Sequence, residues 1–157
     1  MYVFDTNVLI DLFSHYYPSR FPTLWNNFEQ LKKSNQIVSV KEVLQEIDQY
    51  IGKTNLTDWA KANKDIFHAP TQQEVEFVKK IFSIPHFQQN ISAKTILTGK
   101  PAADPFVIAK ATTNKNGIVI TNEANKANSA RIPNICEKFE VRYMNLEQWM
   151  ESLNWRF

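Results

Sequence analysis

The sequence predicts an α/β fold, a three-layer α/β/α sandwich around a central, mostly parallel sheet. Apolar runs at 2–4, 37–38 and 118–120 are typical of buried strands. Helical patterns separate these runs, and such alternation favours a parallel sheet with helices on both faces. A length of 157 residues with 43% apolar content is enough for a substantial core. We therefore expect a single domain over residues 1–157.

The composition is that of an ordinary globular protein and excludes few functions. A net charge of +2 is compatible with nucleic-acid binding but too small to indicate it. No run approaches the roughly 18 apolar residues of a membrane helix. Asp5 interrupts the first apolar stretch, so we expect no secretory leader. Cys136 is the only cysteine, which excludes an intrachain disulfide and favours a cytoplasmic location.

The first strand, 2–4, is expected to end at Asp5 and to lead directly into a helix. Apolar residues at helical spacing over 8–13 predict that helix. A second helical stripe covers 24–31 and is followed by Lys32-Lys33, where positive charge suits a helix C-terminus.

The second strand, 37–38, is followed by a pattern typical of a capping box. In that pattern Ser39 is the N-cap and Glu42 is the third helical residue. The helix that follows contains Glu46 and is expected to end at Gly52, because glycine commonly terminates helices.

We expect a mainly helical insertion around 52–103. A helical stripe formed by Leu56, Trp59, Ala60 and Phe67 opens it, and a second capping box follows at 71–74. From 83 onward the pattern weakens into a long loop with one helical turn near 93–97. Loops of this length in a compact domain are often functional.

The last third of the chain returns to alternating helices and strands. Asp104 is predicted as the N-cap of a helix with Pro105 at its first position. Strands are predicted at 118–120 and 140–144, and Asn145 is expected to cap the C-terminal helix.

Acidic residues follow the predicted strands, begin a predicted helix, or lie in the helix that follows a strand. They are Asp5, Glu42, Glu46, Asp104 and Glu123. Because the carboxyl ends of parallel strands open on one edge of a sheet, we expect these carboxylates to converge there. Converging carboxylates repel one another unless a cation neutralises them. Oxygen ligands of this kind suit Mg²⁺ or Mn²⁺, which assist phosphodiester cleavage.

Capping chemistry offers a simpler explanation for some of these acids. Glu42 is fully explained by the capping box, whereas Glu46 is not, so we favour Glu46 and keep Glu42 as the alternative acid. Asp5 and Asp104 could each serve only as a helix cap. An acid at the end of a buried strand is nevertheless costly without a partner, which favours a functional Asp5.

Four segments carry a family resemblance: VFDTNVLIDL, SVKEVLQEI, ADPFVIAKA and VITNE. In this order they span nearly the whole chain, and the sequence resembles the PIN-domain family, in particular the VapC-like ribonuclease toxins of toxin–antitoxin pairs. The chain is a longer variant, with extra helical content between Gly52 and Ala103.

The resemblance implies a Mg²⁺- or Mn²⁺-dependent ribonuclease. By matched position its acids are Asp5, Glu46, Asp104 and Glu123, which would be both catalytic residues and metal ligands. Glu123 stands where the family usually has aspartate. The resemblance also implies an RNA substrate, a cognate antitoxin protein and a homodimer.

Two further polar residues are expected to support the acids. Asn7 is placed to orient Asp5 or a water molecule, and Thr121 to hydrogen-bond a carboxylate or a bound water. Several lysines flank the predicted acidic edge, where either phosphate contact or simple solvation explains them: Lys94, Lys100, Lys110, Lys115 and Lys126. Solvation is the simpler interpretation for each, and Trp59, Trp149 and Trp155 are interpreted as packing residues.

Two alternative functions stay open at this stage. The first is a PIN-fold module that binds RNA or protein without catalysis. The second is a small-molecule phosphatase with Asp5 as its nucleophile. Such phosphatases usually place a second aspartate two residues later, where this chain has Asn7.

Overall fold

The computed structural model describes residues 1–50, 54–90 and 102–157, and its centre is a five-stranded sheet. The strands are β1 (Tyr2–Phe4), β2 (Ile37–Val40), β3 (Phe67–His68), β4 (Ile118–Ile120) and β5 (Arg142–Met144). Their order in the sheet is β3-β2-β1-β4-β5, and every neighbouring pair is parallel. The predicted parallel sheet is therefore confirmed.

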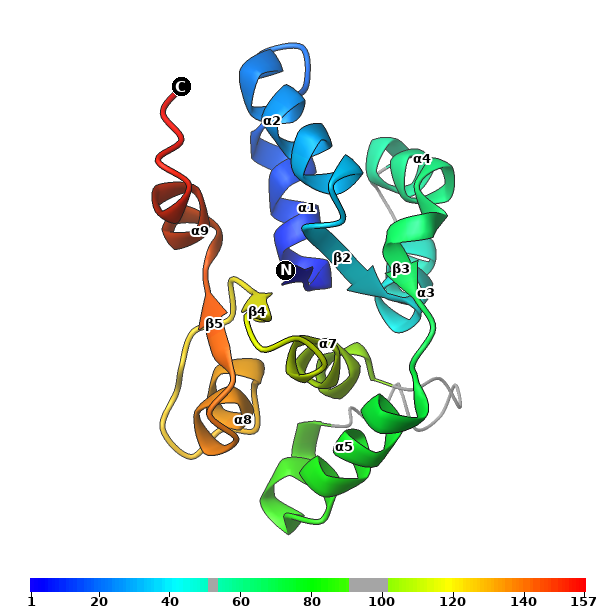
Figure 1. Ribbon diagram of the computed structural model, residues 1–157, viewed down its shortest axis with the longest axis vertical. Helices are drawn as coiled ribbons and strands as arrows, with labels where there is room; N and C mark the ends of the chain where they lie inside the picture. Colours follow the sequence, from blue (N-terminus) through cyan, green and yellow to red (C-terminus); the bar gives the residue numbers. More distant parts are fainter. Residues whose placement is uncertain (51–53, 91–101) are drawn as a thin grey trace.

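Helices cover both faces of the sheet (Figure 1). On one side lie α1 (Thr6–His15), α2 (Pro22–Lys33) and α9 (Leu146–Ser152). On the other side lie α5 (Gln72–Phe82), α7 (Ala103–Thr112) and α8 (Ile132–Lys138). Helices α3 (Lys41–Gln49) and α4 (Thr54–Ala62) lie beyond β2, near β3. The fold is thus the expected three-layer α/β/α sandwich.

The core is built on both faces of β1. Phe4 makes edge-to-face contacts with Phe28 of α2 and Trp149 of α9, at ring-centroid distances of 5.8 and 5.0 Å. Val3 points to the opposite face, against which α7 packs. Trp149 is fully buried, and Trp59 makes an edge-to-face contact with Phe28, so both are packing residues as predicted. Trp155 packs on Trp149 in the same way.

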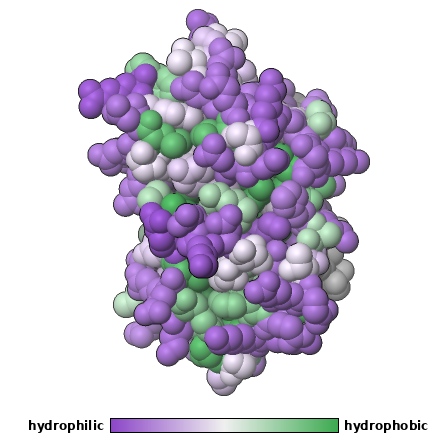
Figure 2. Space-filling model, in the orientation of Figure 1, coloured by the Kyte–Doolittle hydropathy of each residue, from purple (hydrophilic) through white to green (hydrophobic). Residues whose placement is uncertain are grey.

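Hydrophilic residues cover most of the face seen in the space-filling view (Figure 2). Hydrophobic residues show between them, chiefly in the lower half of that view, where Figure 1 draws α5 and α8. Within the described ranges, none of the helices has the length and apolar character needed to cross a membrane.

Two predicted helix starts are wrong. Strand β2 continues through Ser39, whose hydroxyl donates a hydrogen bond to the Phe4 carbonyl at 2.7 Å, so Ser39 is not an N-cap. Helix α3 begins at Lys41 without a side-chain cap. Helix α7 begins at Ala103, which makes Asp104 its second residue and not its N-cap. The cap at Asn145 and the capping box at 71–74 are confirmed.

The stretch between α3 and α7 differs from prediction at Phe67. Its apolar spacing predicts a continuing helix, but α4 ends at Ala62 and the short 3-10 helix η1 (Lys64–Ile66) follows. Phe67 and His68 then form β3, which pairs with the end of β2. A second 3-10 helix, η2 (Pro85–Asn90), is the last described element before α7. Gly52, the turn expected at 93–97, Lys94 and Lys100 lie outside the described residues, and an insertion over 52–103 stays a prediction.

Candidate active site

Asp5 lies at the carboxyl end of β1, in the middle of the sheet, and is the N-cap of α1. Its Oδ1 accepts from the Thr6 backbone N–H at 2.8 Å, and its Oδ2 accepts from the Thr121 hydroxyl at 3.1 Å. Only 3% of the residue is exposed. Burial raises the pKa of Asp5 well above 3.8, and negative charge on Asp104 and Glu123 raises it further.

Asp104 reaches the same cluster from the first turn of α7. Burial raises its pKa, as do the neighbouring carboxylates of Glu123 and Glu46, and the pKa stands at about 7 instead of 3.8. Two hydrogen bonds oppose this shift: the Asn90 side chain donates to Asp104 Oδ2 at 2.7 Å, and the backbone N–H of Asp104 itself also stabilises the carboxylate. Burial and the neighbouring negative charges therefore make the charged form of Asp104 less favourable, and the hydrogen bonds offset only part of this effect.

Glu46 joins the ends of two helices at this site. Its Oε2 accepts from the Thr6 hydroxyl, and its Oε1 accepts from the Ala103 backbone N–H at 3.4 Å. Glu46 is also among the charges that raise the pKa of Asp5 and of Asp104. The structure thus brings Glu46 to the cluster.

Glu42, the alternative acid, lies elsewhere. It is 4% exposed, and its Oε2 has no hydrogen-bond partner among the described residues. Burial raises its pKa, with a smaller effect in the same direction from Glu74 of α5. Glu42 is not among the charges that shift the pKa of Asp5 or Asp104.

Glu123 follows β4 and borders the cluster on the side of α8. Its Oε2 accepts from the Ile132 backbone N–H, the first of α8, at 2.9 Å. Its own backbone N–H donates to the Thr121 hydroxyl at 3.2 Å. One Glu123 oxygen is therefore fixed by the protein.

The two supporting residues form a connected network. Thr121 is 1% exposed, donates to Asp5, and accepts from Asn7 Nδ2 at 3.2 Å. Asn7 Oδ1 in turn accepts from the Asn122 backbone N–H at 2.9 Å. Asn122 Nδ2 donates to Asp11 Oδ2 at 3.0 Å. This network ties the start of α1 to the segment after β4.

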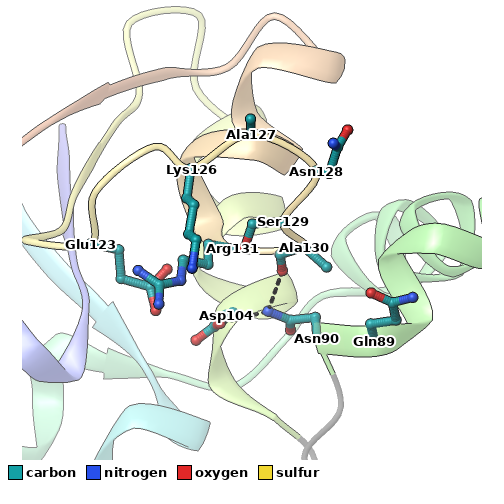
Figure 3. A pocket seen from close by; sticks show the side chains of 10 residues that line it. All are labelled: Gln89, Asn90, Asp104, Glu123, Lys126, Ala127, Asn128, Ser129, Ala130 and Arg131. Carbon is teal, nitrogen blue, oxygen red and sulfur yellow. Dashed lines mark hydrogen bonds between the residues drawn. The ribbon is translucent and has the colours of Figure 1, made fainter.

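A pocket of about 460 Å³ opens beside two of the acids. Asp104 and Glu123 line one part of it, and exposed Lys126 and Arg131 line another. The remaining lining comes from η2 and the segment before α8 (Figure 3): Gln89, Asn90, Ala127, Asn128, Ser129 and Ala130. Acidic and basic groups thus face one cavity.

The lysines that flank the acidic edge have different environments. Lys126 lines the pocket, and Lys115 is exposed on the surface. Lys110 is only 9% exposed, and its Nζ lies 3.2 Å from Glu74 Oε1. The prediction of a solvated Lys110 is therefore wrong, because an acid of α5 pairs with it inside the protein.

Sequence reasoning missed three polar residues of this region. Asn122 directly follows Thr121 in the VITNE segment, so its position was a usable signal. Asn90 and Arg131 carry no pattern of their own, because distant segments bring them to the pocket.

The donor set fits a hard divalent cation. Its oxygens come from carboxylates, and the charges of Glu46 and Glu123 raise the pKa of Asp5 and Asp104, a repulsion that a bound cation would remove. The residues that would hold it are Asp5, Glu46, Asp104 and Glu123. Across residues 1–50, 54–90 and 102–157, no three such side chains surround a common point closely enough to hold an ion as they stand. Binding therefore requires the carboxylates to turn toward the ion.

Comparison with known proteins places the fold. A family model described as a domain of unknown function, DUF4411, matches residues 2–157. No curated protein matches the chain. Among solved structures, the chain is similar to the crystal structure of VapBC2 from Rickettsia felis bound to a DNA fragment from their promoter. That chain is 15% identical, the match covers 92% of this chain and 97% of that one, and the TM-score is 0.50. At this identity the similarity shows a shared fold.

Proposed function

Because the chain belongs to the DUF4411 family, whose description assigns no activity, we propose its function from the site. The protein is a Mg²⁺- or Mn²⁺-dependent endoribonuclease that hydrolyses phosphodiester bonds in RNA. It acts as the toxin of a toxin–antitoxin pair.

One observation carries this proposal: Asp5 and Asp104 lie at the carboxyl edge of the sheet, where the negative charges of Glu46 and Glu123 oppose their ionisation. Asp5 and Asp104 both have raised pKa values, and Glu46 and Glu123 contribute to both shifts. Perturbed carboxyl groups in a cleft are typical of functional sites. A divalent cation, when bound, activates water and stabilises the charge that develops on phosphodiester oxygens.

The chain's own residues hold the carboxylates in place. Thr121 and the Thr6 backbone bind both oxygens of Asp5, and the Thr6 hydroxyl binds Glu46. Partners of this kind orient the oxygens that face a cation. Asn7 uses its amide nitrogen for Thr121 and its amide oxygen for the backbone after β4. Both groups of the Asn7 amide therefore bond within the protein. A phosphatase would need a free acid at this position, so the phosphatase alternative is weakened.

The pocket beside the acids supplies groups for an RNA strand. Lys126 and Arg131 offer positive charge to phosphates, and Arg131 can bind two phosphate oxygens at once. No aromatic side chain is among the described residues of the lining, so Arg131 is the side chain there whose plane could stack on a base. We therefore expect contacts with the sugar–phosphate backbone to dominate binding in this pocket.

The similarity to a VapBC2 structure supports the toxin role. A cognate antitoxin would cover the acidic edge, and a homodimer is the expected assembly. Co-expression with the small protein encoded by an adjacent gene tests this part. A stable complex that suppresses cleavage is the expected result.

Cleavage itself is tested with purified protein and labelled RNA, with and without Mn²⁺. Cleavage should require Mn²⁺ and should be lost in Asp5→Asn, which removes the carboxylate. The variant should still fold, because asparagine caps a helix about as well as aspartate. Asp58→Asn, on the exposed side of α4, is the matched control and should cleave normally. RNA binding without cleavage by the wild-type chain would contradict the proposal and support a non-catalytic binding module.

A further inference from the structure

Asn90, the last residue of η2, connects three separate segments at the pocket. Its Nδ2 donates to Asp104 Oδ2 at 2.7 Å and to the Ala130 carbonyl at 2.9 Å. Figure 3 shows the side chain between these two acceptors, with both bonds drawn. A single amide group therefore links η2, the first turn of α7 and the segment that precedes α8.

The chemistry of the two partners fixes the orientation of this amide. Asp104 Oδ2 and the Ala130 carbonyl are both acceptors, so the atom that faces them has to be the NH₂ group, which has two hydrogens to donate. The opposite orientation would place the Asn90 oxygen against two other oxygens.

The amide oxygen of Asn90 shows that this arrangement has a cost. Oδ1 is buried and accepts no hydrogen bond from any described residue. Buried acceptors without a donor are unfavourable and uncommon in folded proteins. The amide oxygen thus makes no contact with a described residue that would explain an asparagine here, and the explanation lies with the donor group.

A second contact runs between the same two segments. His86, also in η2, lies with its Nε2 3.2 Å from the Ser129 carbonyl. Ser129 and Ala130 belong to the stretch that carries Lys126 and Arg131 along the pocket. Because Asn90 alone among these contacts also reaches an acid, it couples the acid to the basic wall.

We infer that Asn90 is a positioning residue of the site. It holds the Asp104 carboxylate toward the cation, and it holds the wall with Lys126 and Arg131 at a fixed place relative to that carboxylate. This inference rests on the proposed function. It assigns a specific role to η2, the last described element before α7.

The experiment measures Mn²⁺ binding to the RNA-free protein by calorimetry and RNA cleavage in parallel. Asn90→Ala removes both donors, and Asn90→Leu removes them while it keeps similar volume in case the alanine variant does not fold. We expect Mn²⁺ affinity to fall by about 10- to 100-fold in either variant, as for other partners of metal-binding side chains. We expect kcat to fall with it and KM for RNA to rise, because Asn90 also holds the segment that carries Lys126 and Arg131.

Gln88→Ala is the matched control on the same short helix. Gln88 is exposed, and its amide donates to the Phe82 carbonyl, away from the pocket lining. This variant should bind Mn²⁺ and cleave RNA like the wild type.

The outcomes separate the positioning role from the proposed function. Wild-type Mn²⁺ affinity and kcat in both Asn90 variants would overturn the positioning role alone. If the wild-type chain binds Mn²⁺ but cleaves no RNA, the ribonuclease proposal fails, while weaker Mn²⁺ binding by the Asn90 variants still supports positioning. If the wild-type chain binds no Mn²⁺, both proposals are overturned.

Discussion

Asp104→Asn separates the charge of Asp104 from its shape. Asp104 is the second residue of α7 and not its N-cap, so the substitution removes no cap. Asparagine keeps an oxygen that accepts the hydrogen bond from Asn90. What disappears is one negative charge in a cluster where Glu123 and Glu46 oppose it.

The size of the effect follows from the pKa of Asp104. A rise from 3.8 to about 7 makes the charged form less favourable in the folded state. At about 1.4 kcal/mol per pH unit, this amounts to about 4 kcal/mol at pH 8. The folded state keeps its proton while the unfolded state loses it, so metal-free stability falls as pH rises from about 4 to about 7. At pH 5 only about 2 kcal/mol of this penalty is present.

Removal of the charge should therefore stabilise the metal-free protein, and more so at pH 8 than at pH 5. In EDTA we expect the melting temperature of Asp104→Asn to exceed that of the wild type by roughly 10 °C at pH 8, at a few degrees per kcal/mol for a chain of this size. Mn²⁺ at 100 times its Kd should stabilise the folded wild type by about 2.7 kcal/mol and so raise its melting temperature. The same Mn²⁺ concentration should have little effect on the variant.

Calorimetry at both pH values, with Asp58→Asn as the control for loss of one exposed charge, measures this prediction. An equal gain at pH 5 and pH 8, or no gain at all, would refute the electrostatic reasoning. Mn²⁺-dependent cleavage retained by Asp104→Asn would refute the catalytic role of the carboxylate even if the stability change is as expected.

Three other predictions concern the surroundings of the acids. Thr121→Val removes a buried hydroxyl from the network and should lower single-turnover cleavage by about 10- to 100-fold, whereas Thr121→Ser should retain most of it. Lys110→Met leaves Glu74 buried without its partner and should cost about 3–5 kcal/mol in urea unfolding, most of which the added change Glu74→Gln should restore. Lys126→Ala and Arg131→Ala should each raise KM. Each should also make the slope of the log binding constant against the log salt concentration less steep by about 0.7.

The central strands could be predicted from sequence because burial on both faces gives them continuous apolar runs. Ile118–Ile120 is fully buried and has no competing interpretation. The edge strand β3 could not be predicted, because two residues have no period and Phe67 falls at a helical spacing from Trp59. Its pairing with β2 is a tertiary effect that no local pattern shows.

The acids were visible in the sequence because each follows a strand, begins a helix, or lies in the helix that follows a strand. The sequence favours Glu46 over Glu42 because of the capping box expected at Ser39, but β2 continues through Ser39 and α3 has no side-chain cap, so the position of Glu46 follows from where β2 ends. A strand that continues to Val40 places Glu46, and not Glu42, beside the starts of α1 and α7. Asn90 was not visible at all, because its partners lie 14 and 40 positions away and an isolated asparagine forms no pattern.

Helix α7 shows most clearly why we propose a cation at the acidic edge. Lys110 is buried on this helix, and the chain matches it with Glu74 of α5. Asp104 is held on the same helix, yet the charged groups that shift its pKa most are the carboxylates of Glu123 and Glu46. The fold thus compensates the buried charge of Lys110, whereas neighbouring carboxylates oppose the charge of the half-buried Asp104. A bound divalent cation would turn that opposition into favourable binding, which is the physical reason to expect metal-dependent chemistry at this edge.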